Sequence, residues 1–264
     1  MQIELSFIEN LARQAGEILR AGFRKKIRVE EKGEMDLVTE IDRASEDLIV
    51  AEIKKKFPEH TIIAEESGNL PGDDSVTWFI DPLDGTLNYA HGFAYFCVSI
   101  ACSYKGQMQF AVIYDPIQDE CFSAQRGKGA WLNGEPISPS SNTELRKALL
   151  VTGFPDHLRL TENNNVKQFS YLLLRTQSIR RMGAAALNLC YVAAGRFDGY
   201  WQLGVKAWDI AAGTLIAEEA GVKVTSVIGE KDYMKPPYSL LVSAPVLYEI
   251  IFQALQESQA DSAA

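Results

Sequence analysis

The stretch DPLDGTLN at residues 81–88 decides how the rest of the chain is interpreted. The apolar run VTWFI at residues 76–80 comes directly before it and is typical of a buried strand. That strand delivers Asp81 at its carboxyl end, where open α/β sheets bind their ligands. A proline and a glycine then turn the chain, so Asp81 and Asp84 can point into one small volume.

Two carboxylates held this close repel one another unless a cation lies between them, and Mg²⁺ suits hard oxygen ligands of this kind. Gly85 and Thr86 begin a predicted short helix, whose free backbone N–H groups would face the same volume. The stretch therefore predicts an anion site beside a cation site. An Asp-rich turn that only caps a helix is the alternative.

Further acidic residues follow the same pattern. Thr39 and Asp42 lie near the start of a predicted helix, where they would either cap the helix or orient a hydroxyl or water. Glu65 follows a short predicted strand at residues 61–64, and is either a surface turn residue or a metal ligand or base beside Asp81. Asp209 begins another predicted helix, as its N-cap or as a further carboxylate aimed at the metal.

Composition limits the class of protein. The chain has 264 residues and a net charge of −9, from 35 acidic and 26 basic residues, which argues against binding to nucleic acid. Its four cysteines show no C-x-x-C spacing, so we expect reduced, buried thiols in a cytoplasmic protein. Neither a signal peptide nor an apolar run of membrane-spanning length is recognisable, so no membrane association is expected.

The element pattern predicts a mixed α/β fold. An amphipathic helix at residues 4–23 and a charged, lysine-bearing mobile loop around Lys32 precede antiparallel strands between residues 95 and 132. The polar segment at residues 138–142 is the best boundary candidate. We expect an α+β half at residues 1–141 and an α/β half at residues 142–264, in which strands and helices alternate, packed as one compact unit.

Four stretches together resemble the inositol monophosphatase family: residues 36–42, 65–67, 81–88 and 208–213. Two signatures of the family, D-P-[IL]-D-G-T-x-N and W-D-x-A-A-G, match almost completely, and the resemblance covers the chain from its first helix to its last. It implies a layered αβαβα sandwich, a homodimer, and a Li⁺-inhibited phosphatase that requires two or three Mg²⁺ ions.

The resemblance also implies roles for individual residues. One Mg²⁺ would be held by Glu65, Asp81 and the Leu83 carbonyl, and a second by Asp81, Asp84 and Asp209. A third would be supported by Glu65 through water.

For the substrate, the resemblance implies that the backbone of Gly85 and Thr86 receives the phosphate, and that the Ala185 backbone contacts the rest of the molecule. Thr86 paired with Asp42, together with Glu65, would position the attacking water. With three histidines and no recognisable Ser-His or Cys-His pairing, direct attack by a metal-activated water is expected, without a covalent intermediate.

One departure from the family concerns substrate choice. Where inositol phosphatases commonly carry a Glu that accepts hydrogen bonds from substrate hydroxyls, this chain has Gln202, with Lys206 nearby. The leading hypothesis is hydrolysis of inositol 1-phosphate. A fructose-1,6-bisphosphatase or other sugar-phosphate phosphatase is the enzymatic alternative, and a regulatory partner of the transcription machinery is the alternative from another class.

Overall fold

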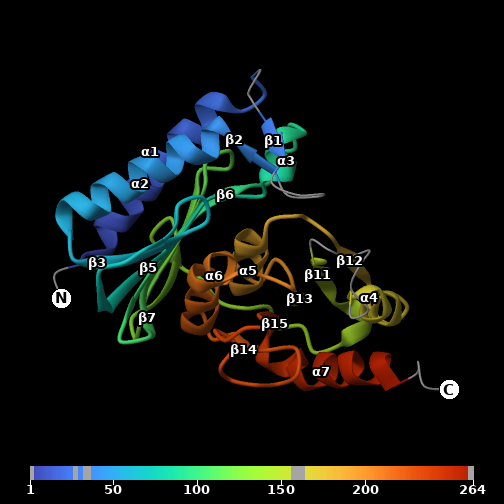
Figure 1. Cartoon of the computed structure of the whole chain (residues 1–264). Coiled ribbons are helices and arrows are strands. Elements are labelled where there is room, and N and C mark those ends of the chain that lie inside the picture. Colours follow the sequence, from blue (N-terminus) through green and yellow to red (C-terminus); the bar gives the residue numbers. More distant parts are fainter. Residues whose placement is uncertain (1–2, 26–28, 32–36, 156–163, 261–264) are drawn as a thin grey trace.

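Five layers, helix–sheet–helix–sheet–helix, make up the fold of the computed structural model (Figure 1). The structure describes residues 3–25, 29–31, 37–155 and 164–260. The mixed α/β class and the layered αβαβα architecture expected from the sequence are confirmed. The loop around Lys32 lies outside the described residues. None of the described helices is long and apolar enough to cross a membrane.

The first sheet has eight strands, and all neighbouring pairs are antiparallel except β3 with β5. In spatial order the strands are β10 (Glu135–Pro136), β9 (Gly129–Leu132), β8 (Glu120–Gln125), β7 (Gln107–Asp115), β6 (Cys97–Tyr104), β5 (Asp73–Asp84), β3 (His60–Ala64) and β4 (Gly68–Leu70). The sequence pattern missed β4, because this short edge strand has no buried residue.

Helices α1 (Leu5–Gly22) and α2 (Glu40–Lys56) cover one face of this sheet, and a two-stranded ribbon of β1 (Val29–Glu31) and β2 (Leu37–Thr39) lies between them in the chain. Side chains of β6 alternate between the two faces as the pleat requires. Val98, Ile100 and Cys102 pack toward α1 and α2, whereas Cys97 and Ala101 pack toward the middle helical layer.

The second sheet has five strands and belongs to the C-terminal half. In spatial order they are β12 (Ser178–Arg180), β11 (Leu149–Thr152), β13 (Gly199–Leu203), β15 (Ser239–Ser243) and β14 (Lys223–Thr225). A 3₁₀ turn, η1 (Leu145–Lys147), leads into it. Helices α4 (Val166–Leu173) and α7 (Pro245–Ala260) pack on its outer face.

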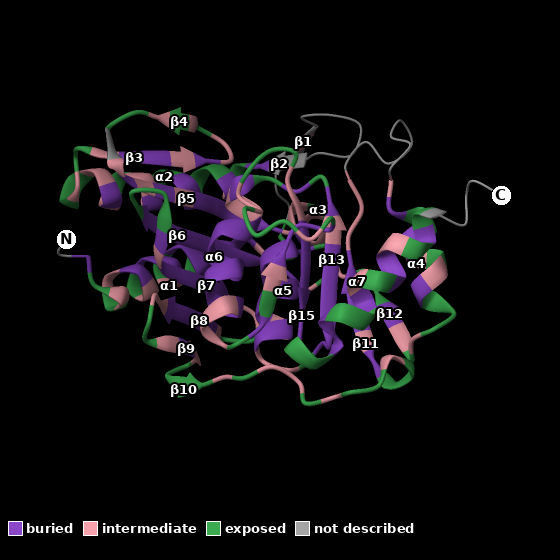
Figure 2. Cartoon of the chain, turned by 90° about the horizontal axis from the view of Figure 1, so that it is seen from below, coloured by how far each residue is buried: buried purple, intermediate pink, exposed green. Residues whose placement is uncertain are grey.

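Between the two sheets lie α5 (Ala185–Ala193) and α6 (Ala207–Glu219) (Figure 1). Both helices are buried along most of their length, as Figure 2 shows, because each has a sheet on either side. Gly213 lets α6 approach α5 closely, since a Cβ there would lie 2.6 Å from the Leu189 Cβ. One apolar cluster includes residues of both sheets and both helices. The division at residues 138–142 stays a prediction.

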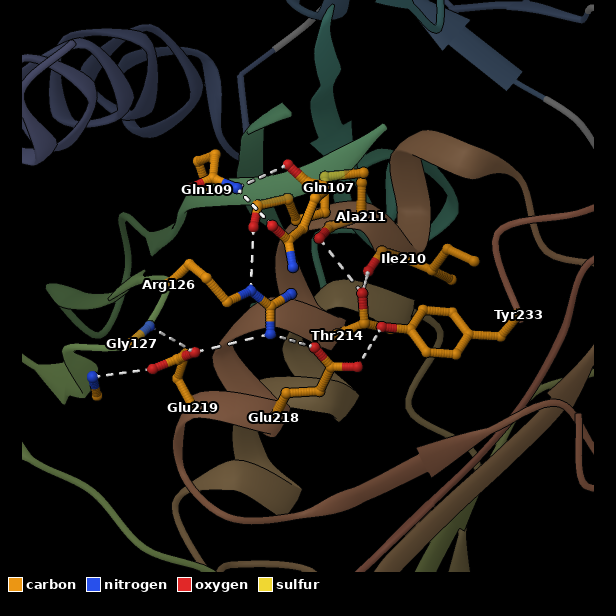
Figure 3. Close-up of polar contacts among 12 residues, drawn as sticks. Gln107, Gln109, Arg126, Gly127, Ile210, Ala211, Thr214, Glu218, Glu219 and Tyr233 are labelled. Carbon is orange, nitrogen blue, oxygen red and sulfur yellow. Dashed lines mark hydrogen bonds and ion pairs between the residues drawn. The ribbon is translucent and has the colours of Figure 1, made fainter. Parts of the chain in front are cut away.

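A polar clamp fixes the C-terminal end of α6 to the first sheet (Figure 3). The Arg126 guanidinium lies 2.7 Å from the Glu218 carboxylate and 3.6 Å from that of Glu219. Glu219 also accepts the backbone N–H groups of Gly127 and Gly129, and the Tyr233 hydroxyl donates to Glu218 over 2.6 Å. The helix that carries Asp209 at its other end is therefore held at a fixed position along the sheet.

Candidate active site

A cavity of about 320 Å³ lies where the first sheet, the middle helices and β13 meet. Of the ten residues that the sequence singled out, nine line it: Glu65, Asp81, Leu83, Asp84, Gly85, Thr86, Ala185, Gln202 and Asp209. The tenth, Asp42, lies directly behind Thr86. The structure thus brings together residues that are up to 167 positions apart, 209 less 42, in the sequence.

Glu65 and Asp81 meet because β3 and β5 run parallel with Ala64 opposite Ile80. The Glu65 N–H donates to the Ile80 carbonyl over 3.1 Å, which places Glu65, just after the end of β3, beside Asp81 in β5. Their carboxyl groups are hydrogen-bonded to each other. Burial, followed by the charge of Glu65, raises the pKa of the Asp81 carboxyl well above its ordinary value.

Asp84 binds the N-terminus of α5. Its two carboxylate oxygens accept the N–H groups of Ala185 and Ala186 over 3.1 and 2.7 Å. Burial raises the Asp84 pKa to about 7, although these two hydrogen bonds act in the opposite direction. The Ala185 N–H, expected to contact substrate, is therefore occupied by a carboxylate of the site in this structure.

Asp209 occupies the third position of α6 and not its N-cap. Lys206, in an extended conformation, is the N-cap, and its N–H donates to the Asp209 carboxylate over 2.7 Å. The N-cap interpretation of Asp209 was therefore wrong by three positions, because the N-cap is Lys206 and the helix begins at Ala207. Its carboxylate still lies on the cavity wall.

Thr86 and Asp42 are hydrogen-bonded, as the resemblance implied. The Thr86 hydroxyl lies 3.1 Å from an Asp42 oxygen and 3.0 Å from the Leu83 carbonyl. The other Asp42 oxygen accepts the hydroxyl and N–H of Thr39, so Asp42 also closes the capping box of α2. Asp42 therefore takes part in capping α2 and also accepts a hydrogen bond from the Thr86 hydroxyl. Burial raises its pKa, and the bonds from Thr39 and Thr86 oppose that rise.

Gly85 is required by the backbone at the start of α3 (Thr86–Ala90). Its φ of +95° is rarely adopted by other residues. A Cβ there would lie 3.0 Å from the Tyr95 carbonyl oxygen and 3.3 Å from the Ala184 Cβ. The turn can therefore approach α5 this closely only without a side chain.

Two residues of α2 that the sequence analysis overlooked hold the acidic turns in place. Buried Glu46 accepts the N–H groups of Glu66 and Ser67 over 2.8 and 2.6 Å, and Ser67 Oγ over 2.5 Å. Ser45 Oγ donates to the Pro82 carbonyl over 3.0 Å. The available signal was that polar residues here continue the helix face on which Ile49 and Ile53 are buried.

Gln202, Lys206 and Arg181 also line the cavity. The Tyr200 hydroxyl donates to Gln202 Oε1 over 2.6 Å. Gly153 leaves the space for this amide, since a Cβ there would lie 1.8 Å from Gln202 Oε1. The cavity lining thus includes hydrogen-bond donors and cations as well as carboxylates.

The donor set of the acidic end fits a hard divalent cation. Glu65, Asp81, Asp84 and Asp209 offer carboxylate oxygens, and the charges of three of them raise the Asp81 pKa, which a bound cation would reverse. Within the described part of the chain, no three His, Cys, Asp or Glu side chains are arranged to hold a metal ion as they stand. Asp84 and Asp209 accept backbone N–H groups instead.

Comparisons with known proteins agree with this picture. The sequence profile of the inositol monophosphatase family matches residues 2–260. A Nus factor SuhB from Vibrio cholerae is 44% identical over 94% of this chain and 93% of its own length. The inositol monophosphatase structure from Anabaena (Nostoc) is 40% identical, has a TM-score of 0.85 and covers 96% of each chain. An IMPase structure from Thermotoga maritima is 34% identical, with a TM-score of 0.88, and covers 97% of this chain and 98% of that chain.

Proposed function

Because the chain belongs to the inositol monophosphatase family, we propose that it is a Mg²⁺-dependent phosphatase of small polyol or sugar phosphates, with inositol 1-phosphate the first substrate to test. The observation that carries the proposal is the cavity in which four carboxylates lie beside Gly85, Thr86 and Asp42. Glu65, Asp81, the Leu83 carbonyl, Asp84 and Asp209 are the proposed metal ligands. Bound Mg²⁺ would neutralise phosphate charge and acidify the attacking water.

The residues of the chain contribute positioning and proton transfer. When Thr86 donates its proton to Asp42, its oxygen is left to accept a hydrogen bond from a water molecule. Glu65 would hold that water from the other side and accept its proton. The water oxygen attacks phosphorus as the ester P–O bond breaks, and the leaving alkoxide oxygen takes a proton from a solvent water molecule. The described residues that line the cavity include no Ser, Cys or His to act as a nucleophile.

The test is phosphate release with Mg²⁺ from inositol 1-phosphate and from fructose 1,6-bisphosphate, side by side. Asp84→Asn removes one ligand charge, so we expect a loss of most activity in a protein that remains folded. Activity within a few-fold of the unaltered protein would contradict the metal assignment. Release from neither ester, in folded protein with Mg²⁺, would contradict the proposed substrate class.

A regulatory function is the second candidate, favoured by the 44% identity to a protein named Nus factor SuhB. Retention of RNA polymerase components on the immobilised protein, unaffected by Asp84→Asn, would support a role in transcription separate from catalysis. The family resemblance also leads us to propose a cytoplasmic homodimer and inhibition by Li⁺. Sedimentation of the purified protein tests the homodimer, and a Li⁺ titration of phosphate release tests the inhibition.

A further inference from the structure

Buried polar side chains connect Tyr95, in the segment just before β6, with Gln202 in the cavity lining. The Tyr95 hydroxyl donates to Asn188 Oδ1 over 3.0 Å. Hydrogen bonding by Asn188 lowers the pKa of Tyr200, against the larger rise from burial, and the Tyr200 hydroxyl donates to Gln202 Oε1 over 2.6 Å. Tyr95, Asn188 and Tyr200 are all less than 5% exposed. We call these three residues the buried relay.

The direction of the relay follows from its first member. Among the recorded bonds of the described residues, Asn188 is the one acceptor for the Tyr95 hydroxyl, and a buried hydroxyl proton without an acceptor is costly. Asn188 therefore presents its oxygen to Tyr95 and its NH₂ group to Tyr200. The single proton of Tyr200 is then left for Gln202. Burial raises the pKa of both tyrosines, so both remain protonated donors.

This direction decides which end of Gln202 faces the substrate. With Oε1 engaged by Tyr200, the NH₂ group of Gln202 is the end left to offer hydrogen bonds to a molecule in the cavity. Gly153 keeps the amide in this position, since any larger residue would collide with it. Lys206 and Arg181 line the same cavity and add two positively charged donors to it.

We propose that the buried relay makes Gln202 a hydrogen-bond donor to substrate and thereby favours phosphate esters that carry a second anionic group. A second phosphate or a carboxylate accepts hydrogen bonds without a proton of its own, whereas a sugar hydroxyl brings a proton that needs an acceptor. Tyr95, Asn188 and Tyr200 act as positioning residues through Gln202. This inference rests on the proposed phosphatase function.

Asn188→Asp reverses the relay. A carboxylate accepts from both tyrosine hydroxyls, so the Tyr200 proton turns away from Gln202, which must then donate its NH₂ group to Tyr200 and present Oε1 to the cavity. We measure kcat/KM for fructose 1,6-bisphosphate and for inositol 1-phosphate in each variant. The ratio of bisphosphate to monophosphate should fall about tenfold, mostly through KM for the bisphosphate.

Three further variants make the test specific. In a protein that already carries Gln202→Ala, adding Asn188→Asp should not change the ratio of bisphosphate to monophosphate kcat/KM. No Gln202 amide remains there for the substitution to turn. A fall of equal size in that background would overturn the proposal, since it would come from the new charge alone. Tyr191→Phe is the matched control: its ring packs on the Tyr95 ring, 5.6 Å between centroids, outside the relay. If Asn188→Asp fails to fold, Gly153→Ala displaces the same amide and should lower the same ratio.

A measurement without catalysis separates this inference from the proposed function. In protein labelled with ¹⁵N-glutamine, the Gln202 NH₂ signals are assigned by their absence from Gln202→Ala. Asn188→Asp should shift one of the two protons downfield and slow its exchange with water, because that proton becomes bonded to Tyr200. Unchanged signals would overturn the relay even in an active phosphatase. The expected shift in a protein that hydrolyses neither ester would uphold the relay while the proposed function fails.

Discussion

Replacement of Glu46 by Gln is predicted to destabilise the protein and to displace Glu65. The Glu46 side chain is 1% exposed and accepts three hydrogen bonds from Glu66 and Ser67, the residues that directly follow Glu65. Glutamine keeps one acceptor oxygen but places an NH₂ group opposite the N–H of Glu66, which is also a donor.

The expected loss follows from these contacts. Two hydrogen bonds to Ser67 change from charge-assisted to neutral, at a cost of about 1 kcal/mol each. The Glu66 N–H loses its acceptor, which costs a further ~1–3 kcal/mol, and removal of a buried charge offsets part of the sum. We therefore expect the free energy of unfolding to fall by about 2–4 kcal/mol.

Urea unfolding followed by circular dichroism measures this difference from the midpoint and slope. Glu52→Gln is the matched control on the same helix, because Glu52 is partly exposed and forms an ion pair with exposed Lys55, so its loss should change stability by less than ~0.5 kcal/mol. Phosphate release should also fall more than tenfold in Glu46→Gln. A Glu46→Gln protein as stable and active as the Glu52→Gln control would refute the reasoning.

Three further predictions concern sites outside the acidic turn at Glu65. Gly85→Ala should lower the free energy of unfolding by about 1–3 kcal/mol, seen in urea unfolding, because φ is +95° and the new Cβ meets the Tyr95 carbonyl. Arg126→Met should lower the free energy of unfolding by about 1–3 kcal/mol, since it leaves two partly buried carboxylates of α6 without their cation. Lys147→Met, which removes an exposed ion pair with Glu144, is the control. Burial raises the Asp115 pKa, so the folded state binds a proton more tightly than the unfolded chain and stability falls as pH rises from ~4 through the folded pKa. Asp115→Asn should remove that part of the slope in unfolding measured from pH 4 to 8, and an identical slope in both proteins would contradict the assignment.

The sequence predicted most elements because local pattern and final environment agree along this chain. The helix expected at residues 4–23 is α1, and the strand expected at residues 61–64 lies within β3. The sequence left open whether the strands before Glu65 and Asp81 are neighbours, and the structure pairs them in parallel. The sequence pattern missed β4, ended the strand before Asp81 although β5 runs to Asp84, and misplaced the first residue of α6.

The sequence indicated which residues line the site, but not most of the hydrogen bonds that hold them in place. Motif spacing identifies which acidic residues converge, yet it carries no information on their hydrogen-bond partners. The bonds of Asp84 to Ala185 and Ala186, and of Glu46 to the turn after Glu65, depend on how α5 and α2 pack against the first sheet. Such contacts arise from tertiary structure alone. The relay behind Gln202 belongs to the same class, because its members come from separate elements.

The bonds between Asp84 and the start of α5 also bear on how the protein is made. Asp84 leaves the ribosome about 100 residues before its partners Ala185 and Ala186, and the face of the first sheet that later contacts α5 and α6 is apolar. Until α5 and α6 have been synthesised, the first sheet therefore has an uncovered apolar face and an incomplete acidic cluster. A prematurely terminated chain would have neither a closed core nor a complete site. Any phosphate release would therefore come only from chains that have been fully synthesised and folded.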